Sequence, residues 1–543
     1  MDLHYATLWE RIADSIGDRD AIATGPIRRT WTEYEDRASR LAGVFQQAGL
    51  GPDSKIGLYL WNGNEYLESQ FAGMKIRGVP INVNYRYLDD ELLYLLENAD
   101  AEAVVFHRSL GDRVARVKDR AKGVKLWVEV DDGGESVPGA IDYEAAIAAA
   151  DPAPRIDRSP TDVYMLYTGG TTGMPKGVMY EIGDMLEAFI GIGFPMMGLG
   201  VPAAHEIPDL VSSLWREQGG IVSIPACPLM HGTGMWLGAM IPHMAGARVV
   251  LLQQRGFDAD ELWRTTQEEK ATQLVIVGDA FARPMLQSLE QAKARGRAFD
   301  PSSVRFMISS GVMWTSEIKQ ALLEWNDFIL VDAMGSSEGS MGNQITTRGN
   351  PGRTAKFAMG PRTKVFSEDG RELKPGSDEA GLIAAGGLVP IGYYKDPEKS
   401  AATFREIDGV RYSFPGDWAR IEADGTLTLL GRGSHCINTA GEKVYPEEVE
   451  EVVKSHPDVS DSLVVGVEDE RLGQRVMAVA SLIDGSSLDG EALREFTRTK
   501  LAGYKVPKQI HVVENVERAP NGKADYAWAR REIQSRIVAD TGS

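Results

Sequence analysis

Apolar positions recur at helical spacing and in short runs along the first third of the chain. Thr32 and Glu35 have the spacing of a capping box and open a helical pattern that Gly49 and Gly51 end. Further strands and a second helix are predicted at Lys55–Leu60, Glu65–Ile76, Ala103–His107 and Val124–Val130. Strands that alternate with helices of this length imply a parallel sheet covered on both faces. The sequence therefore predicts an α/β fold with a large N-terminal domain of parallel-sheet subdomains.

The last fifth of the chain changes character. The glycine-rich stretch Gly431-Arg432-Gly433-Ser434 predicts a hinge. Beyond it lie helical patterns and short strands, at Tyr445–Val453, Val464–Val467, Val476–Leu482 and Glu491–Leu501. About 110 residues with their own strands and helices suffice for a small α+β domain. We therefore expect a large domain over residues 1–431, a hinge at 432–435 and a small, mobile domain over 436–543.

A run of glycines, threonines and one lysine follows the apolar strand Val163–Leu166. It reads YTGGTTGMPKG over residues 167–177. Such a run predicts a loop with uncovered backbone N–H groups, to which hydroxyls and Lys176 add donors suited to a polyphosphate. It differs from the P-loop of phosphate-transferring NTPases, because Lys176 follows Pro175, and Gly177 stands where that motif has Ser or Thr. A Gly/Thr-rich surface turn is the alternative.

Two later strands also end in small residues. Ile308–Val312 is an apolar strand that ends in a turn of small residues, which includes Ser310 and Gly311. Val331–Gly339 repeats this design and contains Glu338. Ligands of parallel sheets bind at the carboxyl ends of strands, and small residues there allow a flat ligand to approach closely. A carboxylate such as Glu338 is suited to hold a divalent cation beside phosphates.

Two segments between these motifs have alternative interpretations. His231, in PLMHGTG at a predicted strand end, is either a site residue or a structural histidine. The stretch Gly191–Pro208 is rich in Gly, Pro and Met and nearly uncharged. It is either an irregular buried loop or an adaptable wall of an apolar pocket, since Met and small residues can repack around varied ligands.

Charge and composition narrow the class of protein. The 543 residues have a formal net charge of −20 and a sequence pI near 5.0, which argues against a nucleic-acid binder. The two cysteines are too few for a disulfide framework or a cysteine-rich metal site. The N-terminus lacks the pattern of a signal peptide, and no apolar run approaches the ~20 residues needed to span a bilayer. We therefore expect a cytoplasmic protein without integral membrane association.

Six motifs together resemble one known family. They are YTGGTTGMPKG, PLMHG, MGSSEG, PGDWAR, GRGSHCINTAGEKVYPEEVE and NGK, in this order along the whole chain. With this order and spacing the chain resembles the adenylate-forming superfamily of acyl-CoA synthetases, peptide-synthetase adenylation domains and luciferases. The strings GYKVP and NGKADYAWA are similar to those of actinobacterial fatty-acyl-CoA synthetases, which include ligases for sterol side-chain acids.

The resemblance implies a role for each matching residue. The phosphates of ATP would be held by Thr168, Gly169, Gly170, Thr171, Thr172 and Lys176. Adenine and the α-phosphate would contact Ser310, Gly311, Val312, Met334, Gly335, Ser336 and Ser337, and the ribose would contact Asp417 and Arg432. Glu338 would bind Mg²⁺, and Lys523 would bridge the carboxylate and ATP. Gly441 and Lys443 would lie at the channel for the pantetheine arm of CoA. The expected catalytic residues are Lys523, Thr168, Glu338 and His231. The alternative for Lys523 is a solvated turn residue.

The chain departs from the family pattern at three places. Met334 stands where the family usually has Tyr or Phe, so a thioether would contact the adenine ring. Ser337 replaces the usual Thr and keeps the hydroxyl. Ser434 and His435 stand where the hinge usually carries an acidic residue or Lys, so the pivot is left open between these two residues.

The function that these residues predict is ATP-dependent conversion of a hydrophobic carboxylic acid to acyl-AMP, followed by transfer to CoA. The pocket is expected to contain His231, Gly232, Met235, Trp236 and Met313 and to take a fatty acid or a steroid side-chain acid. Alternatively, these are core residues near a pocket for a smaller acid. Two other functions remain open: delivery of the acyl group to a carrier-protein thiol, and a non-catalytic nucleotide or acyl sensor. The oligomeric state is left open, with a homodimer as one expectation.

Overall fold

The computed structural model describes residues 3–170, 173–439, 442–469, 472–519 and 522–541. Internal contacts divide the chain into a first unit, Met1–Thr354 with Gly386–Ser413, and a second unit, Ala355–Ala385 with Phe414–Ser543. Both sides of the expected hinge at 432–435 fall in the second unit. The hinge therefore stays a prediction, as do the domain boundaries on either side of it.

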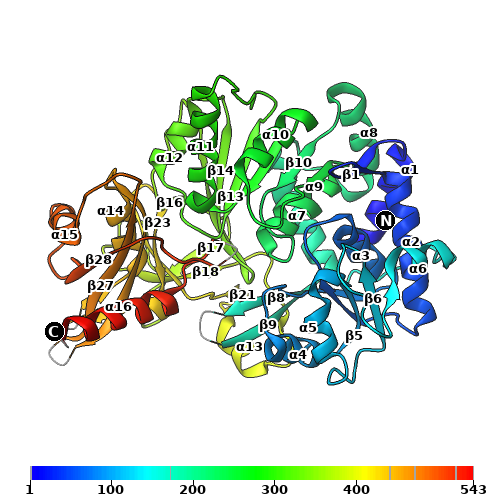
Figure 1. Cartoon of the computed structure of the whole chain (residues 1–543), viewed down its shortest axis with the longest axis horizontal. Helices are drawn as coiled ribbons and strands as arrows, with labels where there is room; N and C mark the ends of the chain where they lie inside the picture. The colour runs from blue at the N-terminus through cyan, green and yellow to red at the C-terminus, as the bar shows by residue number, and fades with distance from the viewer. Residues whose placement is uncertain (1–2, 171–172, 440–441, 470–471, 520–521, 542–543) are drawn as a thin grey trace. The chain divides into compact units, whose positions relative to one another are not determined.

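The first unit contains two sheets with parallel strands, as the alternating pattern predicts (Figure 1). One has the order β4-β3-β5-β6-β7 and is parallel throughout. Its strands are β3 (Lys55–Tyr59), β4 (Val79–Asn82), β5 (Ala101–His107), β6 (Leu126–Val130) and β7 (Ile141–Asp142). β3 is buried along its whole length, which fits a strand covered on both faces.

The other sheet carries most of the predicted nucleotide motifs. In the first unit its order is β2-β1-β11-β10-β12-β13-β14-β15, with parallel pairing from β1 to β14 and antiparallel strands at either end. These strands are β1 (Asp20–Thr24), β2 (Ile27–Thr30), β10 (Val222–Pro225), β11 (Arg248–Leu251), β12 (Gln273–Ile276), β13 (Phe306–Ser310), β14 (Ile329–Ser336) and β15 (Gly339–Thr346). The carboxyl ends of β10, β13 and β14 therefore lie along one edge, as expected for a ligand site.

Helices cover these sheets. They are α1 (Tyr5–Ile16), α2 (Trp31–Gln47), α3 (Asn64–Lys75), α4 (Asp89–Asn98), α5 (Gly111–Val117), α6 (Tyr143–Ala149), α7 (Ile182–Met196), α8 (Ile207–Gln218), α9 (Ile241–Met244), α10 (Ala259–Glu269), α11 (Gly278–Ala294), α12 (Ser316–Leu323) and α13 (Pro397–Thr403). Figure 1 shows α10, α11 and α12 side by side near β13 and β14. A π-helix, η3 (Thr233–Met240), follows β10.

One local prediction in the first unit is wrong, and one of the two interpretations of Gly191–Pro208 is excluded. The capping box of α2 is formed by Thr30 and Glu33, because the helix begins at Trp31, two residues before the predicted start. Trp31 is fully buried, so packing of this side chain sets the first turn. The stretch Gly191–Pro208 is not one buried loop. It includes the end of α7 and the start of α8, and Ile192 and Val201 in it are exposed.

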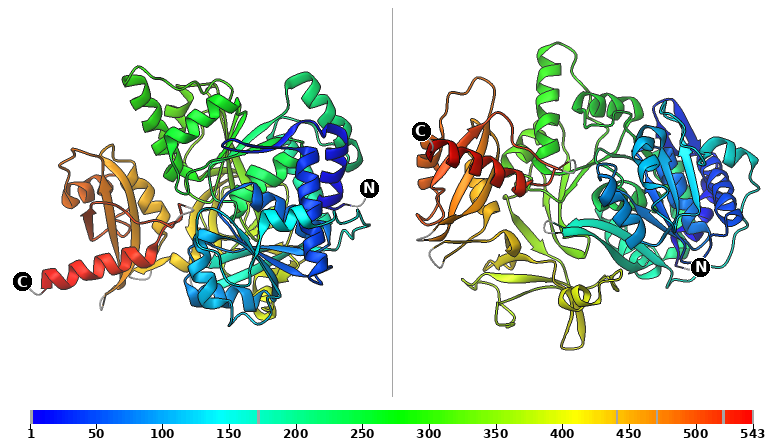
Figure 2. Two further views of the ribbon diagram at one scale, coloured as in Figure 1. Left: turned by 45° about the vertical axis from the view of Figure 1, so that its right-hand side comes forward. Right: turned by 60° about the horizontal axis from the view of Figure 1, so that its bottom comes forward.

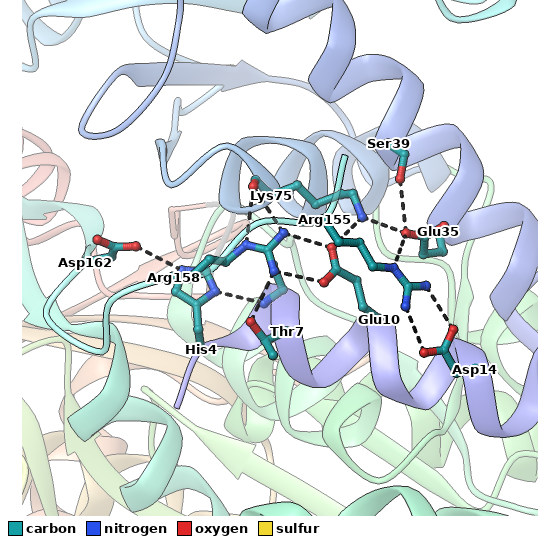
Figure 3. Close-up of polar contacts among 11 residues, drawn as sticks. His4, Thr7, Glu10, Asp14, Glu35, Ser39, Lys75, Arg155, Arg158 and Asp162 are labelled. Carbon is teal, nitrogen blue, oxygen red and sulfur yellow. Dashed lines mark hydrogen bonds and ion pairs between the residues drawn. The ribbon is translucent and has the colours of Figure 1, made fainter. Parts of the chain in front are cut away.

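A buried ion network joins the N-terminal helix to the body of the first unit (Figure 3). Glu10 on α1 accepts from Lys75 at 2.7 Å and from both terminal nitrogens of Arg158 at 2.8 and 2.9 Å. Lys75 also donates to Glu35 on α2 at 2.7 Å. Buried charges are tolerated only when they are paired and hydrogen-bonded, and each of these three meets that condition. The network fixes α1 to α2, α3 and the 151–162 connector.

The second unit contains two sets of paired strands. One set is antiparallel, with the order β16-β23-β22-β18-β17. Its strands are β16 (Lys356–Met359), β17 (Thr363–Phe366), β18 (Gly381–Ala385), β22 (Asp417–Ile421) and β23 (Thr426–Arg432). The other lies beyond the expected hinge and contains β24 (Ile437–Thr439), β25 (Glu442–Val444), β26 (Val459–Asp469), β27 (Gly473–Leu482) and β28 (Gln509–Val513).

The sheet beyond the hinge is covered on both faces by helices. Val464 and Val476 face α14 (Pro446–Lys454) and α15 (Gly490–Arg498) in one core cluster. Leu463 and Val465, the neighbours of Val464, pack with α16 (Tyr526–Thr541) in another. Successive strand residues point to opposite faces, so this alternation builds two cores around one sheet. Figure 2 shows α16, in red, running along one side of this sheet. The small α+β domain predicted from the sequence is thus present as a folded element.

No helix among the described residues is both long and apolar enough for a transmembrane span.

Candidate active site

The predicted phosphate motif is built into a β-hairpin. β8 (Val163–Gly170) and β9 (Gly173–Glu181) pair in antiparallel fashion, with Thr168 opposite Lys176 and Gly170 opposite Gly173. The expectation of an open loop over all eleven residues is therefore wrong. Strand pairing extends as far as Gly170 and Gly173, because two antiparallel strands can be joined by very few residues. Thr171 and Thr172 lie outside the described residues.

Asn82 holds this hairpin at Tyr167. Its side-chain nitrogen donates to the carbonyls of Tyr167 and Met230 at 2.7 Å each, and its oxygen accepts from Tyr167 N at 2.7 Å. Asn82 is the last residue of β4 and is 9% exposed. One side chain from the parallel sheet thus fixes the phosphate motif and the segment that contains His231. Sequence reasoning missed it, since a lone Asn at a strand end carries no local signal.

Lys176 lies against a strand that is distant in the sequence. β19 (Gly392–Tyr393) pairs with β9, and the ammonium of Lys176 lies 5.6 Å from the ring centroid of Tyr393. Lys176 Nζ also lies 2.7 Å from Asp396 Oδ2. This bond lowers the pKa of the Asp396 carboxyl. Asp396 caps α13 with its other oxygen, which accepts from Lys399 N. Lys176 is therefore held near the protein's own carboxylate in a partly exposed position.

Glu338 lies in the turn between β14 and β15. Its Oε1 accepts a hydrogen bond of 2.9 Å from the hydroxyl of Tyr393. The carbonyl of the preceding Ser337 accepts from the hydroxyl of Tyr180 on β9 at 2.8 Å. Two tyrosines of the small sheet β19-β9-β8 thus connect the phosphate hairpin to the MGSSEG motif. The structure brings these two predicted motifs together, through Tyr393, which the sequence analysis did not single out.

The predicted adenine segment after β13 is shaped by a close contact with α11. Gly278, at φ +52°, begins α11, and a Cβ there would lie 2.4 Å from Met313 O and 2.6 Å from Val312 O. Gly278 N donates to Ser309 Oγ at 2.8 Å, and Asp279 N to Met313 O at 3.0 Å. Gly311 follows β13 at φ +95°, where a residue with a side chain would be strained. These contacts place Ser310, Gly311 and Val312 at the strand end as predicted.

The second adenine segment lies on β14 beside a buried ion pair. Met334 is buried, and the register of β14 with β15 shifts between Met334 and Gly335, just before Ser336. Deeper in the strand, Asp332 Oδ2 lies 2.7 Å from Lys319 Nζ on α12, which also donates to Gln344 on β15 at 2.9 Å. Burial raises the pKa of the Asp332 carboxyl, and Lys319 opposes this effect. The pair fastens α12 to the hairpin that carries Ser337 and Glu338.

One predicted pocket residue, Trp236, belongs to an aromatic cluster. Trp236 Nε1 donates to Tyr164 Oη at 2.9 Å, and its ring contacts the rings of Tyr180 and Phe189. Met235 is buried, whereas Gly232, Trp236 and Met313 are partly exposed. His231 begins the turn before the π-helix η3, where its carbonyl accepts from Met235 N at 2.9 Å. π-helical turns are rare and often occur at functional sites, which favours a site at this segment.

The predicted ribose residues meet in the second unit. Asp417 on β22 is the register partner of Arg432 on β23, and Arg432 Nε lies 3.5 Å from Asp417 Oδ1. Glu447 on α14 packs against the same corner. A Cβ on Gly431 would lie 2.1 Å from Glu447 Oε2, and Arg432 N donates to Glu447 Oε1 at 3.5 Å. Burial, with the nearby Glu450, raises the pKa of the Glu447 carboxyl to about 8. The sequence pattern predicts Glu447 only as part of a helix.

The remaining predicted residues lie beyond the hinge. Lys523 is exposed and follows Gly522, whose φ is +73°. Arg518 anchors this turn, because it donates to Gly522 O at 3.1 Å and pairs with Asp461 through two hydrogen bonds. Lys443 is on β25, opposite Asn438, whereas Gly441 lies outside the described residues. His435 is buried with its ring centroid 4.5 Å from that of Tyr526. The roles of these residues stay predictions.

Comparisons with known proteins cover the whole chain. Residues 9–394 match the family described as AMP-binding enzyme, and residues 448–523 match the AMP-binding enzyme C-terminal domain. The chain is 41% identical to a 3-oxocholest-4-en-26-oate–CoA ligase of Rhodococcus rhodochrous, with 99% of this chain and 97% of that protein covered. It is 39% identical to a medium/long-chain-fatty-acid–CoA/3-oxocholest-4-en-26-oate–CoA ligase of Mycobacterium tuberculosis, with the same coverage.

A solved structure agrees on the fold. The crystal structure of the anthranilate CoA ligase AuaEII in complex with anthranoyl-AMP superposes with a TM-score of 0.83 at 19% identity, over 99% of this chain and 98% of that one. The match of both family domains and the identity over the full length lead to one assignment. The chain belongs to the AMP-binding enzyme family, as an enzyme of its acyl-CoA synthetase (acid–thiol ligase) branch.

Proposed function

We propose that the chain uses Lys176, Glu338, Asp417, Arg432 and Lys523 to convert a hydrophobic carboxylic acid and ATP to acyl-AMP and pyrophosphate, and then transfers the acyl group to CoA. The observation that carries this proposal is the meeting of the phosphate hairpin and the MGSSEG turn at Tyr393. These contacts support the proposal that one polyphosphate binds residues more than 150 positions apart in the sequence.

Electrostatics explains why these residue types suit the reaction. A carboxylate that attacks the α-phosphorus of ATP must overcome repulsion between two anions. Lys176 and Lys523 supply positive charge, and the hairpin donors hold the leaving pyrophosphate in line with the attack. The protein's part is therefore mostly positioning and charge neutralisation.

A divalent cation fits the residues around Glu338. Among the described residues no group of three or more His, Cys, Asp or Glu side chains is arranged to hold a metal ion. Mg²⁺ prefers hard oxygen ligands and is often held by one or two carboxylates together with substrate phosphates. The carboxylate of Glu338 is of this kind. When bound, Mg²⁺ would neutralise charge on the phosphates.

The proposed substrate class is a fatty acid or a steroid side-chain acid. It is supported by the substrates of the two ligases near 40% identity, as their names give them, and by the apolar cluster around Trp236. Each buried methylene contributes about 0.8 kcal/mol, so the length and bulk of the acid can be selected by contact with apolar surface. A cytoplasmic location and a homodimer stay predictions.

Pyrophosphate release over a panel of acids, with and without CoA, tests this function. The panel holds short, medium and long fatty acids, a steroid side-chain acid and an aromatic acid. We expect release with the long-chain and steroid acids, and acyl-CoA only when CoA is added. Release without thioester formation would point to a carrier protein as acceptor. No release with any acid would overturn the proposal.

A further inference from the structure

Tyr393 is in contact with both charged ends of the proposed ATP site. Its ring lies under the ammonium of Lys176, and its hydroxyl donates to Glu338. Lys176 belongs to the phosphate hairpin and Glu338 to the turn between β14 and β15. Tyr393 therefore joins the two groups that the proposed function assigns to the phosphates and to the metal ion.

The position of Tyr393 is fixed from several sides. Its backbone pairs with Val178 of β9, and its N–H donates to Ser400 Oγ at 2.8 Å. Its ring centroid lies 5.2 Å from that of Phe404, and only 7% of the residue is exposed. A buried, packed side chain has few rotamers available, so its hydroxyl points in one direction. The hydrogen bond to Glu338 thus restrains the carboxylate.

The restraint leaves one carboxylate oxygen for another ligand. The 2.9 Å bond involves Oε1 of Glu338. A carboxylate has two oxygens with about four lone-pair sites, so Oε2 stays able to ligate a cation while Oε1 is held. Partners of a metal ligand orient it, and their loss typically costs ~10–100-fold in metal affinity.

We propose that Tyr393 is a positioning residue that orients Glu338 for Mg²⁺ and couples magnesium binding to ATP binding at Lys176. This inference rests on the proposed function. It adds a residue from the segment 386–413, outside the six motifs found in the sequence.

ATP binding without any acid substrate tests the coupling apart from turnover. Isothermal titration calorimetry gives the Kd for ATP in EDTA and in saturating Mg²⁺. The Kd in EDTA divided by the Kd in Mg²⁺ is the ratio that measures the coupling. Tyr393→Phe keeps the ring under Lys176 and removes only the hydroxyl. We expect it to reduce the ratio roughly tenfold while the Kd in EDTA stays within about twofold.

The next residue supplies a matched control. Tyr394 donates its hydroxyl to Asp100 at 2.7 Å, away from Glu338. Tyr394→Phe removes the same atom one position along the chain, and both Kd values should stay as in the unchanged protein. Glu338→Gln should lower the ratio by itself, and adding Tyr393→Phe to it should cause no further loss, because both changes act on one carboxylate.

Each outcome decides between separate claims. An unchanged ratio in Tyr393→Phe would overturn the inference. A higher ratio would also overturn it, because the phenol would then compete with the metal ion for the carboxylate of Glu338. If ATP binding weakened equally in EDTA and in Mg²⁺, the role of Tyr393 would be packing alone. Failure of the unchanged protein to bind ATP in either condition would overturn the proposed function, and the inference with it.

Discussion

At the scale of single residues, the exposed lysine of the last turn gives the sharpest test of catalysis. Lys523→Ala should slow adenylate formation by ~10²–10³-fold, because it would remove the positive charge that we propose stabilises the transition state. Thioester formation from supplied acyl-AMP and CoA should stay largely intact. Pyrophosphate release and acyl-CoA formation measure the two half-reactions separately. Equal losses in both would contradict the assigned role.

Gly278 tests how the adenine segment is shaped. In Gly278→Ala the new Cβ would lie 2.4 Å from Met313 O at a φ of +52°, so the segment after β13 must shift. We expect a loss of about 1–3 kcal/mol in the free energy of unfolding. The KM for ATP should rise more than kcat falls, because a displaced segment weakens ATP binding more than it slows the chemical step.

A second glycine provides the control for this change. Gly296 also has a positive φ, +70°, but a Cβ there would have no neighbour within 4 Å. Gly296→Ala should therefore cost only the backbone strain, about 1 kcal/mol, and leave the KM for ATP unchanged. If both variants raised this KM equally, contact with the 312–313 carbonyls would not be the cause.

At the scale of elements, β23 and α14 meet at Glu447, a partly exposed acid whose Oε2 is buried, beside the expected hinge. The pKa of Glu447 is raised from 4.5 to about 8 by burial and by Glu450. The folded state therefore keeps a proton that the unfolded state releases above pH 4.5. Stability from this group is full below pH 4.5 and is lost as the pH rises towards 8.

Glu447→Gln should remove this pH dependence, since a neutral amide of similar shape does not titrate. We expect the stability of the variant relative to the unchanged protein to increase steadily from pH 5 to pH 8. Urea unfolding at several pH values, followed by fluorescence, measures it. A constant difference across this range would show that Glu447 is already ionised in the folded protein.

At the scale of the whole molecule, buried neutral histidines predict sensitivity to acid. His4 accepts from Ala6 N through Nδ1, which caps α1, and burial lowers its pKa to about 3. Burial also lowers the pKa of His107 and of His243 to about 4 each. In the unfolded chain they take up protons near pH 6.5, so stability is lost as the pH falls from 6.5 towards 4.

His4→Asn isolates one of these contributions. Asparagine can still cap α1 but does not titrate, so the variant should lose less stability between pH 6.5 and 4.5 than the unchanged protein. The melting temperature across this range, from circular dichroism, is the measurement. Parallel curves for the two proteins would exclude His4 as a source of the acid sensitivity.

The sequence by itself determined the fold class, the family and part of the secondary structure. Periodicity predicted β3, α3 and β5 and, beyond residue 436, α14, β26, β27 and α15, since local patterns of burial repeat at fixed spacing. The motif order identified the family, and full-length similarity confirmed it. Thr168, Lys176 and Glu338 carry local signals, because glycines, hydroxyls and charges are grouped around them.

Only the tertiary structure decided which of these residues meet. Three tertiary contacts show this. Tyr393 donates a hydrogen bond to Glu338, Asn82 holds two motifs, and Glu447 contacts Gly431. These residues are far apart in sequence or lie in helices and strands without a distinctive local pattern. The phosphate motif was expected as a loop, yet it pairs as a hairpin. Strand pairing and burial depend on partners elsewhere in the chain, and no local pattern records them.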